Sequence, residues 1–255
     1  MRRCPPRPSQ HPPSSPAWIP ALQRLLDVAP RGHPLTRARL RHWHVPAGLA
    51  AQLVQQGWLQ RLGADAFVLR GDAPTIDGTL AWLCRQVPGL HVGGRMALDW
   101  QGVRHFVALR PRLTLWGAAP ACLPRWVGTV FAHSYQGTSL FDRHLPRDFG
   151  ITGLPDHHPA VRVSVPERAI LELVSDRAMT SPEGMRLVLE TVRTLRRPVL
   201  ETLLHHCHRH DTCHALACLA ADIDTPWADW VHQLAAAQTH DDPIEAPRRL
   251  GAGAG

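Results

Sequence analysis

The sequence predicts a mixed α/β protein of two domains, and three observations favour this fold class. With 255 residues, of which 44% are hydrophobic, the chain is long enough to bury two modest cores. Residues 17–72 show three short helical patterns followed by two strand-like stretches around a tight turn. Residues 73–235 first alternate strand-like and helical stretches and then become helical in their second half.

The two ends of the chain are predicted to lie outside these domains. Residues 1–16 are rich in proline and arginine and lack the apolar core of a signal peptide, so we expect a disordered tail. Residues 236–255 close in alanine and glycine, and we expect a flexible tail there. Because no stretch approaches the roughly 20 apolar residues that cross a membrane, we expect a cytoplasmic protein without membrane contact.

Two helices are predicted to open the N-terminal domain. From Ala17 onward, apolar residues recur at helical spacing and form one stripe, which contains Leu22, Leu25, Leu26 and Ala29. A stretch with two prolines and a glycine ends this first helix. Thr36 is placed to cap a second helix over residues 37–43, in which Leu40 and Trp43 face inward.

A third helix and a hairpin complete the domain. Pro46 suits the first position of a helix that runs to about Gln56 and ends at Gly57. Its predicted buried residues are Leu49, Leu53 and Val54. Two strand-like stretches, residues 58–62 and 66–70, flank a tight turn at residues 63–65. Three short helices followed by a hairpin predict a winged helix-turn-helix.

Positive charge is concentrated in the first quarter of the chain, which comprises the N-terminal tail and this domain. The net charge of the chain is +7, and the first 71 residues hold ten arginines and two acids, a net of +8 (10 minus 2). The remainder holds 18 basic and 19 acidic residues, a net of −1 (18 minus 19). A basic block beside a nearly neutral remainder indicates that the first domain meets a polyanion such as double-stranded DNA.

The geometry of a winged helix-turn-helix on DNA predicts a role for the polar side chains of each element. Its third helix enters the major groove, while the second helix and the wing contact phosphates. Glutamine can bind adenine with two hydrogen bonds, and arginine neutralises phosphates without reading sequence. The candidate DNA-binding residues are therefore Thr36, Arg37, Arg39, Arg41, Gln52, Gln55 and Arg61. The same surface could instead contact another protein.

The second domain is predicted to open with a helix and then several strands. Thr75 is placed to cap a helix whose apolar face contains Ile76, Leu80, Leu83 and Val87. The predicted elements that follow are a strand at 90–92, a Gly-Gly turn, a helix at 95–100, strands at 112–115 and 127–131, an irregular segment to about residue 160, and a strand at 161–164.

The second half of this domain is predicted to be helical. Ser164 and Glu167, with Val165 and Pro166 between them, form the pattern of a capping box at the start of a helix. The apolar face of this helix contains Ile170, Leu171, Leu173 and Val174. Ser181 is expected to start the next helix in the same way, and a third helix contains Leu200, Leu203 and Leu204. The tryptophans predicted to be core residues are Trp82, Trp100 and Trp116, and Trp58 is expected to pack the wing against the helices.

Three segments resemble the AbiEi family of antitoxins in order and spacing. Residues 57–63, Gly-Trp-Leu-Gln-Arg-Leu-Gly, resemble the wing segment of that family. Residues 91–98, His-Val-Gly-Gly-Arg-Met-Ala-Leu, resemble its next strand-to-helix segment, and residues 165–173, Val-Pro-Glu-Arg-Ala-Ile-Leu-Glu-Leu, its most recognisable stretch. The resemblance covers roughly residues 17–206, and after Cys207 the chain departs from the family pattern.

This resemblance implies an autorepressor and antitoxin of a type IV toxin–antitoxin system. In that family the winged helix binds repeats in its own promoter, which allows protomers to pair on DNA. The C-terminal domain counteracts a nucleotidyltransferase-like toxin without needing a stable complex with it. Two alternatives stay open: a stand-alone DNA-binding regulator without antitoxin activity, and a nuclease tethered to DNA by its winged helix.

We predict no enzymatic activity, no catalytic residue, no cofactor and no metal site. The chain contains no lysine, which excludes Walker-A loops, Schiff-base enzymes and nucleases that need a catalytic lysine. Ser134 next to His133 is a poor candidate for a nucleophile and its base, because sequence neighbours seldom form a catalytic geometry. Possible zinc ligands gather late in the chain without a standard finger spacing, and helix-end histidines are the favoured interpretation of His205, His206, Cys207, His208, His210, Cys213, His214 and Cys218.

Overall fold

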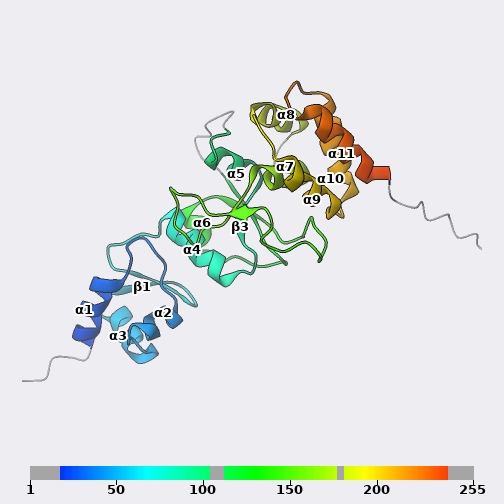
Figure 1. The fold of residues 1–255 in the computed structure, drawn as a ribbon. Helices are drawn as coiled ribbons and strands as arrows, with labels where there is room; N and C mark the ends of the chain where they lie inside the picture. Colours follow the sequence, from blue (N-terminus) through cyan, green and yellow to red (C-terminus); the bar gives the residue numbers. More distant parts are fainter. Residues whose placement is uncertain (1–17, 104–111, 177–180, 241–255) are drawn as a thin grey trace, which may run out of the picture. The chain divides into compact units, whose positions relative to one another are not determined.

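The computed structural model describes residues 18–103, 112–176 and 181–240, which divide into two compact units (Figure 1). Unit 1 consists of residues up to Trp82 together with the short segment 124–130, and unit 2 contains the rest. The tail predicted for residues 1–16 lies outside the described residues, as do residues 241–255. Within the described part, no helix combines the length and apolar character that a membrane crossing requires.

Unit 1 has the three helices and the hairpin of a winged helix-turn-helix, as predicted. Its elements in chain order are α1 (Trp18–Val28), α2 (Arg37–His42), α3 (Ala47–Gln55), β1 (Leu59–Gly63) and β2 (Ala66–Leu69). Strands β1 and β2 pair antiparallel and form the wing. Leu35, just before α2, pairs with Phe67 of β2, so the wing is joined to the helices through main-chain hydrogen bonds.

Local chemistry sets the ends of α2 and α3. The Thr36 hydroxyl accepts a hydrogen bond from the main-chain nitrogen of Arg39 at 3.1 Å, which confirms the predicted N-cap. His44 adopts a positive φ of 59° in the turn between the helices. Pro46 is the N-cap residue of α3 and not its first helical residue, one position away from the prediction. Gly57, at a φ of 73°, ends the helix as expected because this conformation favours glycine.

The core of unit 1 is built mainly from leucines of the three helices. Leu25, Leu40 and Leu53 are fully buried, whereas Leu49 and Val54 are only partly buried against the same cluster. Leu26, which the helical spacing placed in the same apolar stripe, is 43% exposed and lies outside the core. Because α1 turns its Ala21 side toward the core, Leu26 lies about a quarter turn away from the buried stripe.

Residues 127–131 do not form the predicted strand. They contain a short helix, α6 (Val127–Val130), which belongs to unit 1. Its preceding residue, Trp126, packs edge-on against Trp82 with ring centroids 5.3 Å apart and lies directly against Gly63 of the wing. The β-branched residues favoured a strand, but this tertiary packing overrides such a weak local preference.

Unit 2 is built around a mixed five-stranded sheet. Its strands are β3 (His91–Val92), β4 (Leu113–Trp116), β5 (His133–Gln136), β6 (Ile151–Thr152) and β7 (Val163–Ser164), in the spatial order β5-β4-β3-β7-β6. The pairs β3–β7 and β4–β5 are parallel, and the pairs β3–β4 and β6–β7 are antiparallel. The prediction of an irregular segment to residue 160 was wrong for β5 and β6, because these edge strands are short and carry no apolar alternation.

The remaining helices follow the predicted order. They are α4 (Ile76–Gln86), α5 (Gly94–Trp100), α7 (Pro166–Ser175), α8 (Pro182–Thr191), α9 (Arg197–His205), α10 (His210–Ala221) and α11 (Ala228–His240). Thr75 and Ser181 cap α4 and α8 as predicted, but Ile76 is 41% exposed and not buried. Helix α7 packs against α5, α9 and α10, and residues 167–174 of it are buried (Figure 1). Helix α11 continues beyond residue 235, where the flexible tail was expected to begin.

Candidate functional site

The candidate base-reading residues lie on an exposed surface of α3. Gln52 and Gln55 are both exposed, and the opposite side of the helix buries Ala50 and Leu53 in the core of unit 1. Gln56 follows as the C-cap residue and is also exposed. A helix that places polar amides outward and leucine inward has the form of a recognition helix.

Arg37 differs from the other candidate arginines because its side chain already contacts residues of the wing. Its Nη2 donates a hydrogen bond to the main-chain oxygen of Ala64 at 2.9 Å, and its Nε lies 3.7 Å from a carboxylate oxygen of Asp65. Its main-chain nitrogen also donates to that carboxylate, at 3.0 Å. Arg37 and Asp65 therefore join the start of α2 to the tip of the wing.

Arg39, Arg41 and Arg61 are exposed and form no ion pair within the described residues. The Arg39 guanidinium lies over the Trp43 ring, 4.9 Å from its centroid, and that of Arg61 lies 5.5 Å from the centroid of Phe67. Aromatic stacking holds a guanidinium in place without neutralising its charge. Unit 1 thus presents arginines from both α2 and the wing.

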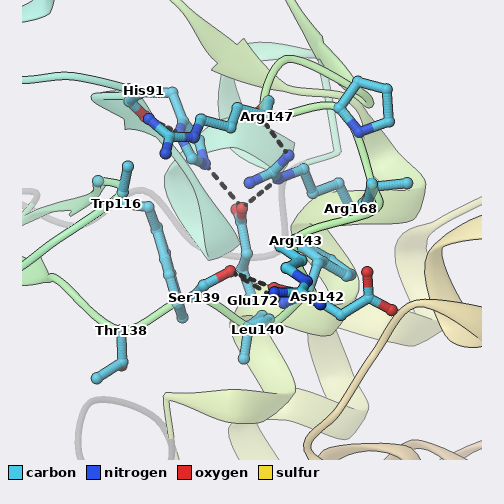
Figure 2. Close-up of a pocket in the computed structure, with 16 residues that line it drawn as sticks. His91, Trp116, Thr138, Ser139, Leu140, Asp142, Arg143, Arg147, Arg168 and Glu172 are labelled. Carbon is cyan, nitrogen blue, oxygen red and sulfur yellow. Dashed lines mark hydrogen bonds and ion pairs between the residues drawn. The ribbon is translucent and has the colours of Figure 1, made fainter.

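Unit 2 contains a different polar arrangement, a buried cluster centred on Glu172 of α7 (Figure 2). The Oε1 atom of Glu172 accepts hydrogen bonds from His91 Nε2 at 2.8 Å and Arg168 Nε at 2.9 Å. Its Oε2 atom accepts from the Ser164 hydroxyl at 2.7 Å and the main-chain nitrogen of Gly94 at 3.1 Å. Four donors from β3, β7, α5 and α7 therefore meet at one carboxylate.

The hydrogen bonds of this cluster define its charges. Both ring nitrogens of His91 face oxygen acceptors, because Nδ1 lies 2.8 Å from the carbonyl oxygen of Gly89. Burial alone would raise the pKa of Glu172, but the charge and hydrogen bond of His91, together with Arg168 and Ser164, lower that pKa to about 2. The cluster thus pairs the Glu172 carboxylate with the Arg168 guanidinium, next to the His91 ring.

The capping box predicted at the start of α7 is not formed. Val165 is the N-cap residue and makes no side-chain cap hydrogen bond. Ser164 donates to Glu172 instead, and the carboxylate of Glu167 accepts hydrogen bonds from the main-chain nitrogen, Nε and Nη2 of Arg196 at 2.7, 3.0 and 2.8 Å. Both side chains are used for tertiary contacts, which satisfy them more completely than a cap would.

A cavity of about 270 Å³ opens beside Glu172, entirely within unit 2. Figure 2 shows His91, Arg147 and Arg168 gathered on one side of Glu172 and Trp116 on another. Gly93, next to the cluster, permits this close packing, since a Cβ there would collide with the Glu172 carboxylate and the Trp116 ring.

Two family models match consecutive parts of the chain. A model described as the N-terminal domain of AbiEi antitoxin transcriptional regulators matches residues 20–109, and one described as a transcriptional regulator, AbiEi antitoxin of type IV toxin–antitoxin systems, matches residues 110–243. The chain belongs to the AbiEi family. The match extends well past Cys207, where the resemblance was expected to end.

The fold of this AbiEi chain has a counterpart among solved structures. The crystal structure of the RV2827C protein from Mycobacterium tuberculosis is similar over 89% of this chain and 83% of that one, with a TM-score of 0.56 and 17% sequence identity. At this identity the similarity concerns the fold alone. No curated protein matches the sequence.

The other groups considered from the sequence make separate contacts in this AbiEi chain. Within the described residues, no three His, Cys, Asp or Glu side chains are arranged to hold a metal ion. Cys218 and His214 lie 3.7 Å apart on α10, while His206 contacts Asp142 through Nδ1 at 3.0 Å. Ser134 and His133 are neighbours on β5, where successive side chains point to opposite faces.

Sequence reasoning did not identify Glu172 or His91 as a pair. A local signal existed for Glu172, which is four residues after Arg168 and flanked by apolar residues on an otherwise buried helix. No local sequence signal pointed to His91, because it lies 81 positions from Glu172 in the chain.

Proposed function

We propose that the chain is a transcriptional autorepressor and antitoxin that binds repeats in its own promoter through unit 1. The exposed glutamines of α3, flanked by arginines of α2 and the wing, carry this proposal. Membership of a family of antitoxin transcriptional regulators supports the general role. Gln52 and Gln55 would contact base edges, and Thr36 would support the interface by capping α2.

The arginines would contribute unequally to DNA binding. Arg39, Arg41 and Arg61 would neutralise phosphates, since their charges are exposed and without an acidic partner within the described residues. Arg37 would mainly hold the wing against α2, because its guanidinium already contacts Ala64 and Asp65. Replacing Arg37 should therefore change affinity less than replacing Arg39 or Arg41.

A gel-shift experiment tests the proposal. The full-length protein is titrated against its own upstream DNA and a scrambled duplex across a salt series, with a variant lacking residues 1–72 as a control. We expect retardation of the upstream DNA that weakens with salt and is lost in the truncation. Equal weak binding to both duplexes would reduce unit 1 to a non-specific tether, and absence of binding would point to a protein partner.

Point variants separate base reading from phosphate contact. Gln52→Ala and Gln55→Ala should each reduce the preference for the upstream DNA by about 1–3 kcal/mol, with Gln233→Ala on α11 as the matched control. Arg41→Gln should weaken binding to both duplexes alike and lower the slope of log K against log salt by about 0.9. Arg193→Gln, an exposed arginine of unit 2, is the matched control for this charge change.

We further propose that the chain counteracts a nucleotidyltransferase-like toxin through unit 2 without being an enzyme itself. The use of Glu167 and Glu172 in ion pairs supports a binding role, because neither carboxylate is left to act on a substrate. The proposal predicts a nucleotidyltransferase gene next to that of this chain, and co-expression of the chain should restore the growth of cells that this nucleotidyltransferase inhibits. Failure of this rescue, with promoter binding intact, would favour a stand-alone regulator. Metal-dependent cleavage of DNA by the purified protein would revive the nuclease alternative.

A further inference from the structure

The cavity beside Glu172 carries more positive than negative charge in its wall. Three arginines line it, namely Arg143, Arg147 and Arg168, together with His91. Its acidic residues are Glu172 and Asp142. Three guanidinium groups therefore face two carboxylates.

Neither carboxylate is free to neutralise the two outer arginines. Glu172 uses both oxygens on donors of the buried cluster. Asp142 accepts from the main-chain nitrogen of His144 at 2.7 Å and contacts His206 Nδ1 at 3.0 Å, and the hydrogen bond with His206 is the main reason that its pKa is lowered. Arg143 and Arg147 are exposed and form no ion pair within the described residues.

Arg168 is held in place with donor capacity to spare. Its Nε donates to Glu172, and its Nη1 donates to the main-chain oxygens of Phe149 at 2.8 Å and Arg147 at 3.4 Å. Its Nη2 forms no hydrogen bond with any described residue, although the side chain is only 11% exposed. The guanidinium also lies over the Phe141 ring, 5.0 Å from its centroid. A fixed, mostly buried guanidinium with an unused N–H is a preorganised anion contact.

We propose that this cavity binds a small anion through a phosphate or carboxylate group, an activity separate from DNA binding. Guanidinium groups match the geometry of both oxyanions, and Arg143, Arg147 and Arg168 supply them to the cavity lining. The volume of about 270 Å³ suits a small molecule. Trp116 and Leu140, also in the lining, would contact an apolar part of the ligand.

Calorimetric titration of the full-length protein tests this proposal with two probes, inorganic phosphate and succinate, at constant ionic strength. The variants are Arg143→Gln and Arg147→Gln, singly and combined, because both residues are exposed and tolerate substitution. Arg193→Gln, an exposed arginine elsewhere in unit 2, is the matched control. Each cavity variant should weaken binding about tenfold, the loss expected for one charge-assisted hydrogen bond. The control should bind like the parent protein.

The two probes distinguish the possible ligands. Saturable binding of phosphate alone would assign the cavity to phosphorylated ligands, and binding of succinate alone would assign it to carboxylates. Binding that the cavity variants leave unchanged would place the anion elsewhere, for example on the arginines of unit 1, and would overturn the proposal. Absence of binding of either probe at millimolar concentration would overturn it as well.

Discussion

Glu172→Gln is the substitution that tests the buried cluster most directly, because it removes one charge and keeps the shape of the side chain. In the folded protein the pKa of Glu172 is about 2, against 4.5 for an ordinary glutamate. At 1.36 kcal/mol for each pH unit, this difference of about 2.5 corresponds to about 3 kcal/mol of stability at neutral pH. The amide would also leave His91 and Arg168 buried without an anion, so the loss should reach at least this value.

The pH dependence follows from the sign of the pKa change. A carboxyl group with a lowered pKa in the folded state stabilises the protein above its unfolded pKa, here 4.5, and loses that contribution as the pH falls toward 2. The stability difference between parent and variant should therefore be constant from pH 7 to about 5.5 and fall by about a quarter at pH 4. More than about half of it should be gone at pH 3.

Urea unfolding at each pH, followed by tryptophan fluorescence and circular dichroism, measures this difference. Trp116 lies beside the cluster and should report on unit 2. Glu201→Gln is the matched control, since Glu201 is 42% exposed and its one ion pair among the described residues is with Arg197 on the same helix face. The control should change stability by less than about 0.5 kcal/mol. If Glu172→Gln were as mild as the control at pH 7, the charged cluster described above would be refuted.

Two further substitutions test contacts outside this cluster. Thr36→Ala removes the N-cap of α2 and should lower the free energy of unfolding of unit 1 by about 1 kcal/mol, which thermal unfolding measures. In gel shifts, the variant should lose DNA affinity only at temperatures at which unit 1 is partly unfolded. Arg196→Ala leaves the 2% exposed carboxylate of Glu167 with one main-chain donor and should cost about 2 kcal/mol, whereas Glu167→Gln should cost about 1 kcal/mol. Urea unfolding that ranked these two variants in the reverse order would contradict the assignment of Glu167 as the buried partner.

Elements whose signals are local could be predicted from the sequence. Thr36, Thr75 and Ser181 each accept a hydrogen bond from a main-chain nitrogen three residues later, which is the contact that their positions indicated. The wing was predictable for the same reason, since a tight turn between two apolar stretches defines a hairpin. In each of these features both partners lie close together in the sequence, so the sequence shows the whole contact.

Elements that depend on distant partners could not be predicted. Ser164 and Glu167 have the spacing of a capping box, yet a carboxylate on α7 and a guanidinium before α9 bind them more strongly. In the same way, the candidate DNA-binding residues follow from charge and helical pattern, but the contact of Arg37 with Asp65 requires the wing to fold back on α2. Side chains whose spacing suits a local contact can therefore bind a distant group instead, when that group satisfies them better.

The Glu172 cluster connects the fold of unit 2 with its cavity. A buried ion pair adds little net stability, because the cost of removing charges from water offsets their attraction, and apolar residues of the same volume would often stabilise the fold as well. Net stability alone therefore explains poorly why four donors from β3, β7, α5 and α7 converge on one carboxylate. Holding Arg168 rigid at the cavity wall is a stronger reason for this arrangement, because Glu172 fixes its Nε while its Nη2 has no hydrogen bond with a described residue. On this argument, the large cost of removing Glu172 and the binding of an anion in the cavity have the same structural cause.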